Sequence, residues 1–124
     1  MKLYLAGPAH GHPRYYAPLF QRTAAMLRLE EHAVFFPLEQ PICKALAAAG
    51  GALEEAAVEY DAARILLLGL EWICEEAEGV VALPDWRGFR SSRAEVAAAD
   101  ALNLPVWPAA EFLLRGREAT AVTS

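Results

Sequence analysis

Cysteine is scarce in this 124-residue chain, which has only Cys43 and Cys74, without the paired spacing of a metal-binding motif. We interpret both as buried, reduced thiols of a cytoplasmic protein, a compartment that disfavours a disulfide between them. His10 and His12 suggest a metal, but no third ligand of matching type is evident. We therefore expect no metal and no other cofactor.

Long hydrophobic runs are also missing. The most apolar stretch, Ile65–Leu70, is bounded by charged residues and is much shorter than the roughly 18 residues of a membrane span. No secretory signal is evident after Met1, because Gly7 and Pro8 interrupt the first apolar run. We expect a cytoplasmic protein that does not bind membranes.

Positive charge is in the minority, since 11 Lys and Arg against 16 Asp and Glu give a formal net charge of -5. Polymeric nucleic acid usually binds to a basic face, so this balance disfavours it as a partner. Hydrophobic residues nevertheless make up 56% of the chain, which is enough for a core. The length predicts a single domain over residues 1–114, followed by a flexible tail over residues 115–124.

Short buried strands alternate with helical segments along the chain. Four near-continuous apolar runs are typical of parallel strands covered on both faces. They are Lys2–Ala6, Ala33–Phe36, Val80–Leu83 and Leu104–Trp107. Helical periodicity predicts helices over Pro18–Glu31, Ala52–Glu76, Ala94–Leu102 and Glu111–Leu114, with Gly69 as a point where the second kinks or divides. The alternation predicts a three-layer α/β fold, with a parallel sheet of four to five strands and helices on both faces.

Two unusual loops follow the first and third predicted strands, where parallel sheets bind their ligands. They are Gly7–Tyr16 and Pro84–Ser92. In the first, Gly7 and Gly11 allow the backbone to approach a ligand, and Tyr15 and Tyr16 offer aromatic faces and hydroxyls. The same loop is equally consistent with a tight turn whose tyrosines pack on the edge of the sheet.

The second loop combines hydroxyls with positive charge. Ser91 and Ser92 lie where a helix is expected to begin, and free backbone N–H groups at such a position attract anions. Arg87, Arg90 and Arg93 surround them. The segment therefore suits a phosphate or a carboxylate, but it also suits solvated surface arginines.

Glu95 admits two interpretations. Its spacing from Ser92 fits a capping box, in which the carboxylate accepts a hydrogen bond from the Ser92 backbone N–H, and the spacing alone favours this cap. A carboxylate one turn into a helix at a pocket floor can instead act as a nucleophile or base. Asp85 likewise either binds ligand hydroxyls or occupies a Pro-Asp turn, and Trp86 forms either pocket wall or core.

Both halves of the chain carry motifs that resemble one known family. The first half has Tyr4-Leu5-Ala6-Gly7-Pro8, Gly11-x-Pro13-x-Tyr15-x-x-Pro18-x-Phe20, Ala24-x-x-Leu27-Arg28 and His32-x-Val34-x-x-Pro37. The second half has Leu83-Pro84-x-Trp86, Arg90, Glu95, Ala98, Ala101-Leu102 and Leu104-Pro105-Val106. These motifs resemble the nucleoside 2-deoxyribosyltransferase-like family, in its small, mostly uncharacterised branch from bacteria and their phages.

The resemblance implies a flavodoxin-like, Rossmann-like sheet and cleavage or transfer at the N-glycosidic bond of a nucleoside or nucleoside monophosphate. By its offset from Trp86, Glu95 takes the position of the family's nucleophile, which favours a pocket role over the cap. A neighbouring subunit often completes the pocket in this family, and we expect a homodimer or larger assembly through Ala52–Glu76. The substrate-binding residues would be Tyr4, Gly7, Pro8, Gly11, Tyr15, Tyr16, Asp85, Trp86, Arg90, Ser91 and Ser92.

Three positions depart from the family pattern. Phe89 stands where the branch usually has a serine that holds a phosphate or sugar oxygen, so Ser91 or Ser92 would have to replace it. Glu78 replaces an aspartate before the third strand, and Glu31 replaces a glycine, so the first helix should end in another way. These departures motivate an alternative function, a nucleotide- or metabolite-binding module of the same fold with impaired catalysis.

Overall fold

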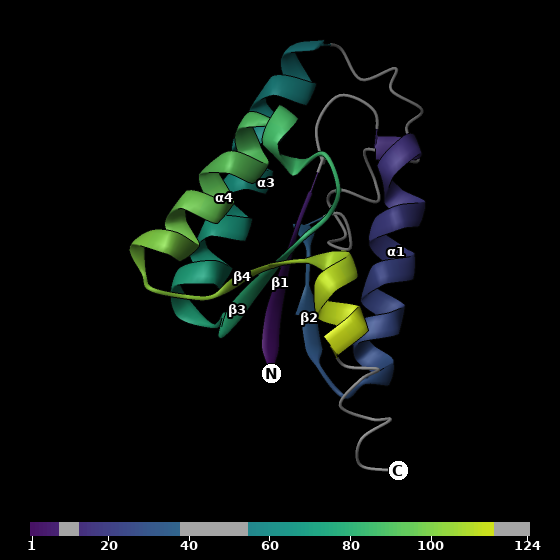
Figure 1. Ribbon diagram of the computed structural model, residues 1–124. Coiled ribbons are helices and arrows are strands. Elements are labelled where there is room, and N and C mark those ends of the chain that lie inside the picture. The colour runs from purple at the N-terminus through teal and green to yellow at the C-terminus, as the bar shows by residue number, and fades with distance from the viewer. Residues whose placement is uncertain (8–12, 38–54, 116–124) are drawn as a thin grey trace.

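The described strands form one parallel sheet with the first strand in its interior. The computed structural model describes residues 1–7, 13–37 and 55–115, and its strand order is β2-β1-β3-β4 (Figure 1). The strands are β1 (Lys2–Ala6), β2 (Ala33–Phe35), β3 (Gly79–Ala82) and β4 (Val106–Pro108). All neighbouring pairs are parallel.

Helices cover both faces of this sheet (Figure 1). On one face lie α3 (Glu55–Glu75) and α4 (Arg90–Ala101), and on the other lie α1 (Pro13–Leu29) and a helix over residues 109–115. A short 3-10 helix, η2 (Trp86–Gly88), precedes α4. This three-layer, Rossmann-like arrangement confirms the predicted fold class. Within the described ranges, no helix has the length and apolar character needed to cross a membrane.

The side chains of β1 divide between two cores, because neighbouring residues of a strand point to opposite faces. Leu3 and Leu5 lie in the core that includes Phe20 of α1. Tyr4 lies in the second core, which includes Ile73 of α3. All of these side chains are buried, which explains why β1 is continuously apolar from Leu3 to Ala6 rather than alternating.

Helix α1 begins at Pro13, earlier than the predicted start at Pro18. Pro13 takes the first helical position, where a missing N–H costs nothing. Pro18 lies inside the helix, exposed to solvent, and removes one backbone hydrogen bond from it. Tyr15 and Tyr16 therefore belong to the first turn of α1 and not to the predicted loop.

Helix α1 ends in a Schellman motif. Glu31 has a φ of 68°, its N–H donates to the Arg28 carbonyl at 3.0 Å, and the His32 N–H donates to the Leu27 carbonyl at 3.2 Å. The expectation that the helix would end in another way was wrong, because Glu31 adopts the left-handed conformation that glycine usually supplies. Asn103, with a φ of 58°, has the same role after α4.

Helix α3 runs through Gly69 as one helix, so the predicted division there is wrong. Cys74 on this helix is a free, exposed thiol, which corrects the prediction that it is buried. The neighbouring Ile73 takes the inward position instead. Cys43, like residues 116–124 of the predicted tail, lies outside the described residues.

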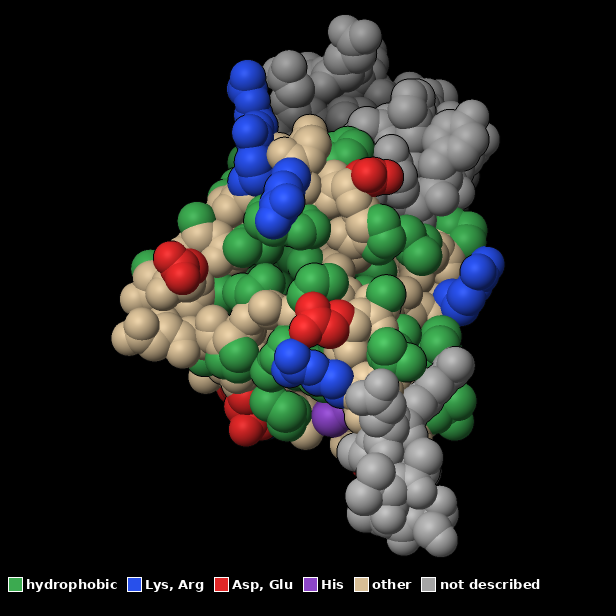
Figure 2. All heavy atoms as spheres, in the orientation of Figure 1, with side chains coloured by type: hydrophobic (Ala, Val, Ile, Leu, Met, Phe, Trp, Pro, Cys, Tyr) green, Lys and Arg blue, Asp and Glu red, His purple; other side chains and the backbone are tan. Residues whose placement is uncertain are grey.

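Other boundaries shift by a few residues. Helix α4 begins at Arg90 rather than Ala94, and β4 begins at Val106 rather than Leu104. The last predicted helix is present and extends over residues 109–115. On the face of the molecule in Figure 2, charged side chains of both signs are interspersed among hydrophobic ones, without a continuous basic surface over the described residues.

Replacing Glu31 with glycine should stabilise the protein, because glycine adopts a left-handed backbone without the strain that a glutamate side chain causes there. We expect Glu31→Gly to raise the free energy of unfolding by about 0.5–1 kcal/mol in urea denaturation. As a control, Gln21→Gly changes an exposed residue in the interior of α1 and should lower the free energy of unfolding by about 0.5–1 kcal/mol. A destabilising effect of Glu31→Gly would contradict this account of the helix end.

Candidate functional site

The carboxyl ends of β1 and β3 meet at one edge of the sheet, and the first turn of α4 is bonded to this edge. The Leu83 N–H donates to the Ala6 carbonyl at 2.8 Å, just beyond the two strands. The Ser92 hydroxyl of α4 donates to the Gly7 carbonyl at 2.5 Å. Both Gly7 and Ser92 are buried, so this bond anchors α4 directly to the end of β1.

Close packing around Gly7 leaves no room for a side chain. A Cβ atom there would lie 2.8 Å from Cδ1 of Leu83 and 3.0 Å from Cζ of Phe20. Contacts this short would force the surrounding core apart. Glycine therefore lets the end of β1 pass between these two side chains and brings its carbonyl within reach of Ser92.

Glu95 is a buried carboxyl that contacts the central strand. Its side chain projects from α4, only 4% of the residue is exposed, and the fully buried Tyr4 hydroxyl donates a hydrogen bond to its Oε2 atom. Burial raises the pKa of Glu95 to about 8. The carboxyl therefore holds its proton through most of the neutral range, although it can ionise in mildly alkaline solution.

The capping-box interpretation of Glu95 is wrong. Phe89, in an extended conformation with φ −125° and ψ 129°, is the N-cap of α4, so Ser92 already lies inside the helix. The first hydrogen bond of the helix joins the Arg93 N–H to the Phe89 carbonyl at 3.0 Å. Glu95 is thus directed at Tyr4 and the sheet rather than at the start of its own helix.

Ser91 brings a buried hydroxyl to the first turn of α4. The residue is 7% exposed, and its Oγ atom has no hydrogen-bond partner within the described part of the chain. The backbone N–H groups of a first helical turn also lack partners inside the helix. Since an unpaired buried hydroxyl is costly, these groups together suit an incoming anionic oxygen.

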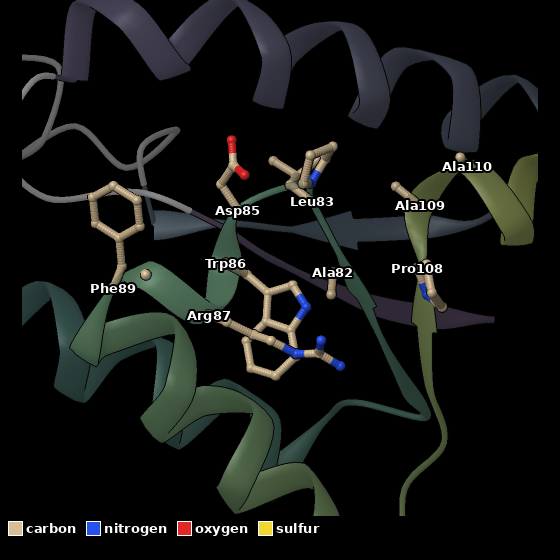
Figure 3. Close-up of a pocket in the computed structure, with 11 residues that line it drawn as sticks. Ala82, Leu83, Asp85, Trp86, Arg87, Phe89, Pro108, Ala109 and Ala110 are labelled. Atoms are coloured by element: carbon tan, nitrogen blue, oxygen red, sulfur yellow. The ribbon is translucent and has the colours of Figure 1, made fainter.

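A cavity of about 530 Å³ opens at the ends of β3 and β4. Figure 3 shows Trp86 and Phe89 on one side of it and Pro108 and Ala109 on the other, while Asp85 and Trp86 point in opposite directions. Its walls are largely apolar, with few charged groups, as is usual for sites that bind small molecules.

The charged residues near the cavity have different environments. Asp85 lines it and has a φ of 67°, so its backbone forms the turn that was one of its two interpretations. The guanidinium carbon of Arg87 lies 5.3 Å from the centre of the Trp86 ring, in a cation–π contact. Arg90, at the start of α4, is exposed and does not line this cavity.

Six of the predicted site residues therefore fall into two groups. Hydrogen bonds link one group, which consists of Tyr4, Gly7, Ser92 and Glu95. The cavity brings together Asp85 and Trp86, and the residues that line it do not include Glu95 or Tyr4. Arg90 and Ser91 lie at the start of α4 and belong to neither group. The structure gives the backbone of Tyr15 and Tyr16, whereas Pro8, Gly11, His10 and His12 lie outside the described residues.

Glu78 lies at the opposite edge of the sheet. Its carboxylate accepts a hydrogen bond from the Lys2 N–H at 2.8 Å, at the amino end of β1. The replacement of the family's aspartate by Glu78 is therefore remote from the Glu95 carboxyl and the cavity.

Sequence reasoning missed Gly69 as a site residue. A Cβ atom at Gly69 would overlap the Tyr4 hydroxyl and lie 2.9 Å from Oε2 of Glu95. The available signal was a glycine in the interior of a long helix, which is destabilising and usually has a packing or functional reason.

The Glu95→Gln variant should become more stable than the wild type as the pH rises. The carboxyl has a pKa of 4.5 in the unfolded chain and about 8 in the folded protein. Between these values the folded state binds more protons, so the wild type loses stability with rising pH. Glutamine keeps the shape without the charge.

We expect the free energies of unfolding of wild type and Glu95→Gln to be similar near pH 4.5 and to differ by about 2–4 kcal/mol at pH 8.5. Urea denaturation across this range measures the difference. Glu71→Gln, which changes an exposed carboxyl of α3, serves as the control and should show no comparable trend. A constant difference between wild type and Glu95→Gln would contradict the assignment.

Comparison with known proteins identifies a family but no activity. No curated protein and no solved structure matches the chain. One family model, described as a domain of unknown function (DUF4406), matches residues 1–107. The match includes β1, β3, α4 and both groups of candidate site residues. Because it extends over most of the sequence, this chain belongs to the DUF4406 family.

Proposed function

We propose that this protein cleaves the N-glycosidic bond of a nucleoside or nucleoside monophosphate, by transfer or hydrolysis, with Glu95 as the nucleophile. The observation that carries the proposal is the buried Glu95 carboxyl, bonded to Tyr4. A carboxyl with a strongly raised pKa is typical of functional sites. The sequence resemblance to deoxyribosyltransferase-like proteins supports the same reaction and the same residue.

The reaction would proceed in two steps through a glycosyl-enzyme ester. The Glu95 carboxylate attacks the anomeric carbon, the carbon–nitrogen bond breaks, and the base leaves with the bonding electrons and takes up a proton from water. Water or a second base then attacks the same carbon and gives up a proton, the ester bond breaks, and the free sugar or a new nucleoside leaves as the carboxylate is restored. Tyr4, whose hydroxyl donates to Oε2, orients this carboxyl and favours its charged form.

The start of α4 favours a substrate that carries a phosphate. The unpartnered Ser91 hydroxyl and the first-turn N–H groups supply hydrogen-bond donors there, and the side chains of Arg90 and Arg93 are exposed on the same segment. Trp86 and Phe89 offer aromatic faces to a base at the adjoining cavity. We therefore infer that a monophosphate is preferred over a bare nucleoside.

One observation favours a second function, a binding module without catalysis. Glu95 is almost fully buried, and it does not line the described cavity. A nucleotide or related metabolite held by Trp86 and Phe89 would not need to meet this carboxyl. The same fold would then recognise a ligand without cleaving it.

The purified protein should release free base when it is incubated with a panel of nucleosides and 5′-monophosphates. Chromatography measures the base, and Glu95→Gln should reduce its release to background. Because the pKa of Glu95 is about 8, the rate should rise roughly tenfold per pH unit below this value and level off above it.

The same panel distinguishes the two functions. Ser91→Ala should weaken activity on monophosphates and leave activity on nucleosides unchanged. Calorimetric binding without release of base would reject the enzyme and support the binding module. The absence of both binding and release across the panel would contradict both functions.

We also propose that the protein forms a homodimer or larger assembly through α3. Leu67, on this helix, is 55% exposed within a run of leucines. Light scattering should give at least twice the chain mass of 13.5 kDa. Leu67→Glu should lower the measured mass, whereas Leu29→Glu, which changes an exposed leucine of α1, should not. A wild-type mass of one chain would contradict the assembly.

A further inference from the structure

Gly69 lies where α3 passes closest to the hydrogen bond between Tyr4 and Glu95. The residue is buried, and a Cβ atom placed on it would overlap the Tyr4 hydroxyl. The same atom would lie 2.9 Å from Oε2 of Glu95 and 3.1 Å from Cζ of Tyr4. Real Cβ atoms essentially never make contacts below 3.0 Å, so any side chain at this position would have to displace the pair.

General closeness between α3 and the sheet does not explain this glycine. Ile73 lies one turn later in α3, on the same buried side, and its large side chain is accommodated with only 1% exposure. The close approach at Gly69 is therefore local to the Tyr4 hydroxyl and the Glu95 carboxyl. Because glycine is less favourable than alanine inside a helix, its presence here calls for a specific reason.

We propose that Gly69 is a positioning residue for Glu95, because its missing side chain leaves the space in which the Tyr4 hydroxyl and the Glu95 carboxyl meet. Three elements meet at this point. Strand β1 carries the hydroxyl, α4 carries the carboxyl, and α3 leaves room for both because Gly69 has no side chain. This positioning role of Gly69 does not require the protein to be an enzyme. Its consequence for catalysis rests on the proposed function of Glu95.

The ionisation of Glu95 reports on this arrangement. Burial is the cause of its raised pKa, without a contribution from a charged neighbour among the described residues. Tyr4, from β1, is the titratable side chain that bonds to the carboxyl, and α3 approaches the carboxyl with the backbone of Gly69. A methyl group at this position would displace the hydroxyl. The carboxylate would then lose a donor, which raises its pKa further.

The first experiment compares Gly69→Ala with Gly88→Ala, since a Cβ atom at Gly88 would meet nothing within 4 Å. Carbon-13 NMR of glutamate-labelled protein follows the titration of the Glu95 carboxyl, whose signal is identified by its loss in Glu95→Gln. We expect the titration midpoint of Gly69→Ala to rise by about one pH unit. That of Gly88→Ala should stay at the wild-type value. A wild-type midpoint in Gly69→Ala would overturn the proposal.

The second experiment removes the displaced atom. Tyr4→Phe should raise the titration midpoint of Glu95 by itself, and adding Gly69→Ala to it should cause no further rise. The Tm should fall in Gly69→Ala and recover in part in the double variant, because the new methyl then takes the place of the missing hydroxyl, although it still lies close to Oε2 of Glu95. Additive shifts of the midpoint, or an equal loss of Tm in both backgrounds, would show that Gly69 acts elsewhere and reject the proposal.

These measurements need no substrate, so they separate the positioning role from the proposed function. If the wild type releases base, the alkaline midpoint of its pH–rate profile should move upward in Gly69→Ala by the same amount as the NMR titration. If base release is absent but the titrations shift as expected, the positioning role is supported and the proposed function fails. If base release is present but Gly69→Ala keeps the wild-type pH–rate profile, the positioning role is rejected.

Discussion

The buried hydrogen bond between Tyr4 and Glu95 joins the centre of the sheet to α4, and the surrounding elements are arranged to permit it. Tyr4 can reach α4 because β1 is an interior strand whose successive side chains enter different cores. Glu95 lies opposite it because the hydrogen bond from Ser92 to Gly7 fixes the start of α4. Helix α3 can pack over the pair because Gly69 has no side chain.

This arrangement opposes stability at neutral pH. A carboxyl whose pKa rises to about 8 on folding makes the folded state less stable as the pH increases toward that value. The exposed ion pair between Lys2 and Glu76 has no such effect, since pairs in water contribute little in either direction. Proteins usually retain a destabilising buried group where function requires it. The burial of Glu95 therefore supports its proposed role independently of sequence resemblance.

The sequence predicted the elements whose signals are local. Continuous apolar runs located β1 and β3, because strands buried on both faces have no polar side to alternate with. The start of α4 could not be found in this way. The spacing of Ser92 and Glu95 matches a capping box, but the Ser92 hydroxyl bonds a carbonyl 85 residues earlier in the chain. Gly69 likewise predicts a kink or a division of the helix, since only the folded structure shows what its missing side chain accommodates.

The first two turns of α4 connect the two groups of site residues. Phe89, the N-cap, lines the cavity, Ser91 presents an unpartnered hydroxyl, and Glu95 meets Tyr4. Along a helix, the axial distance from Phe89 to Glu95 is about 9 Å, which one small ligand can span. A phosphate at the first turn would place the rest of such a ligand beside this segment. Under the proposed function, such a ligand would meet the Glu95 carboxyl only if it extended toward Tyr4, whereas a ligand that extended toward the cavity would be bound without being cleaved. The orientation of the ligand would therefore decide between bond cleavage and recognition.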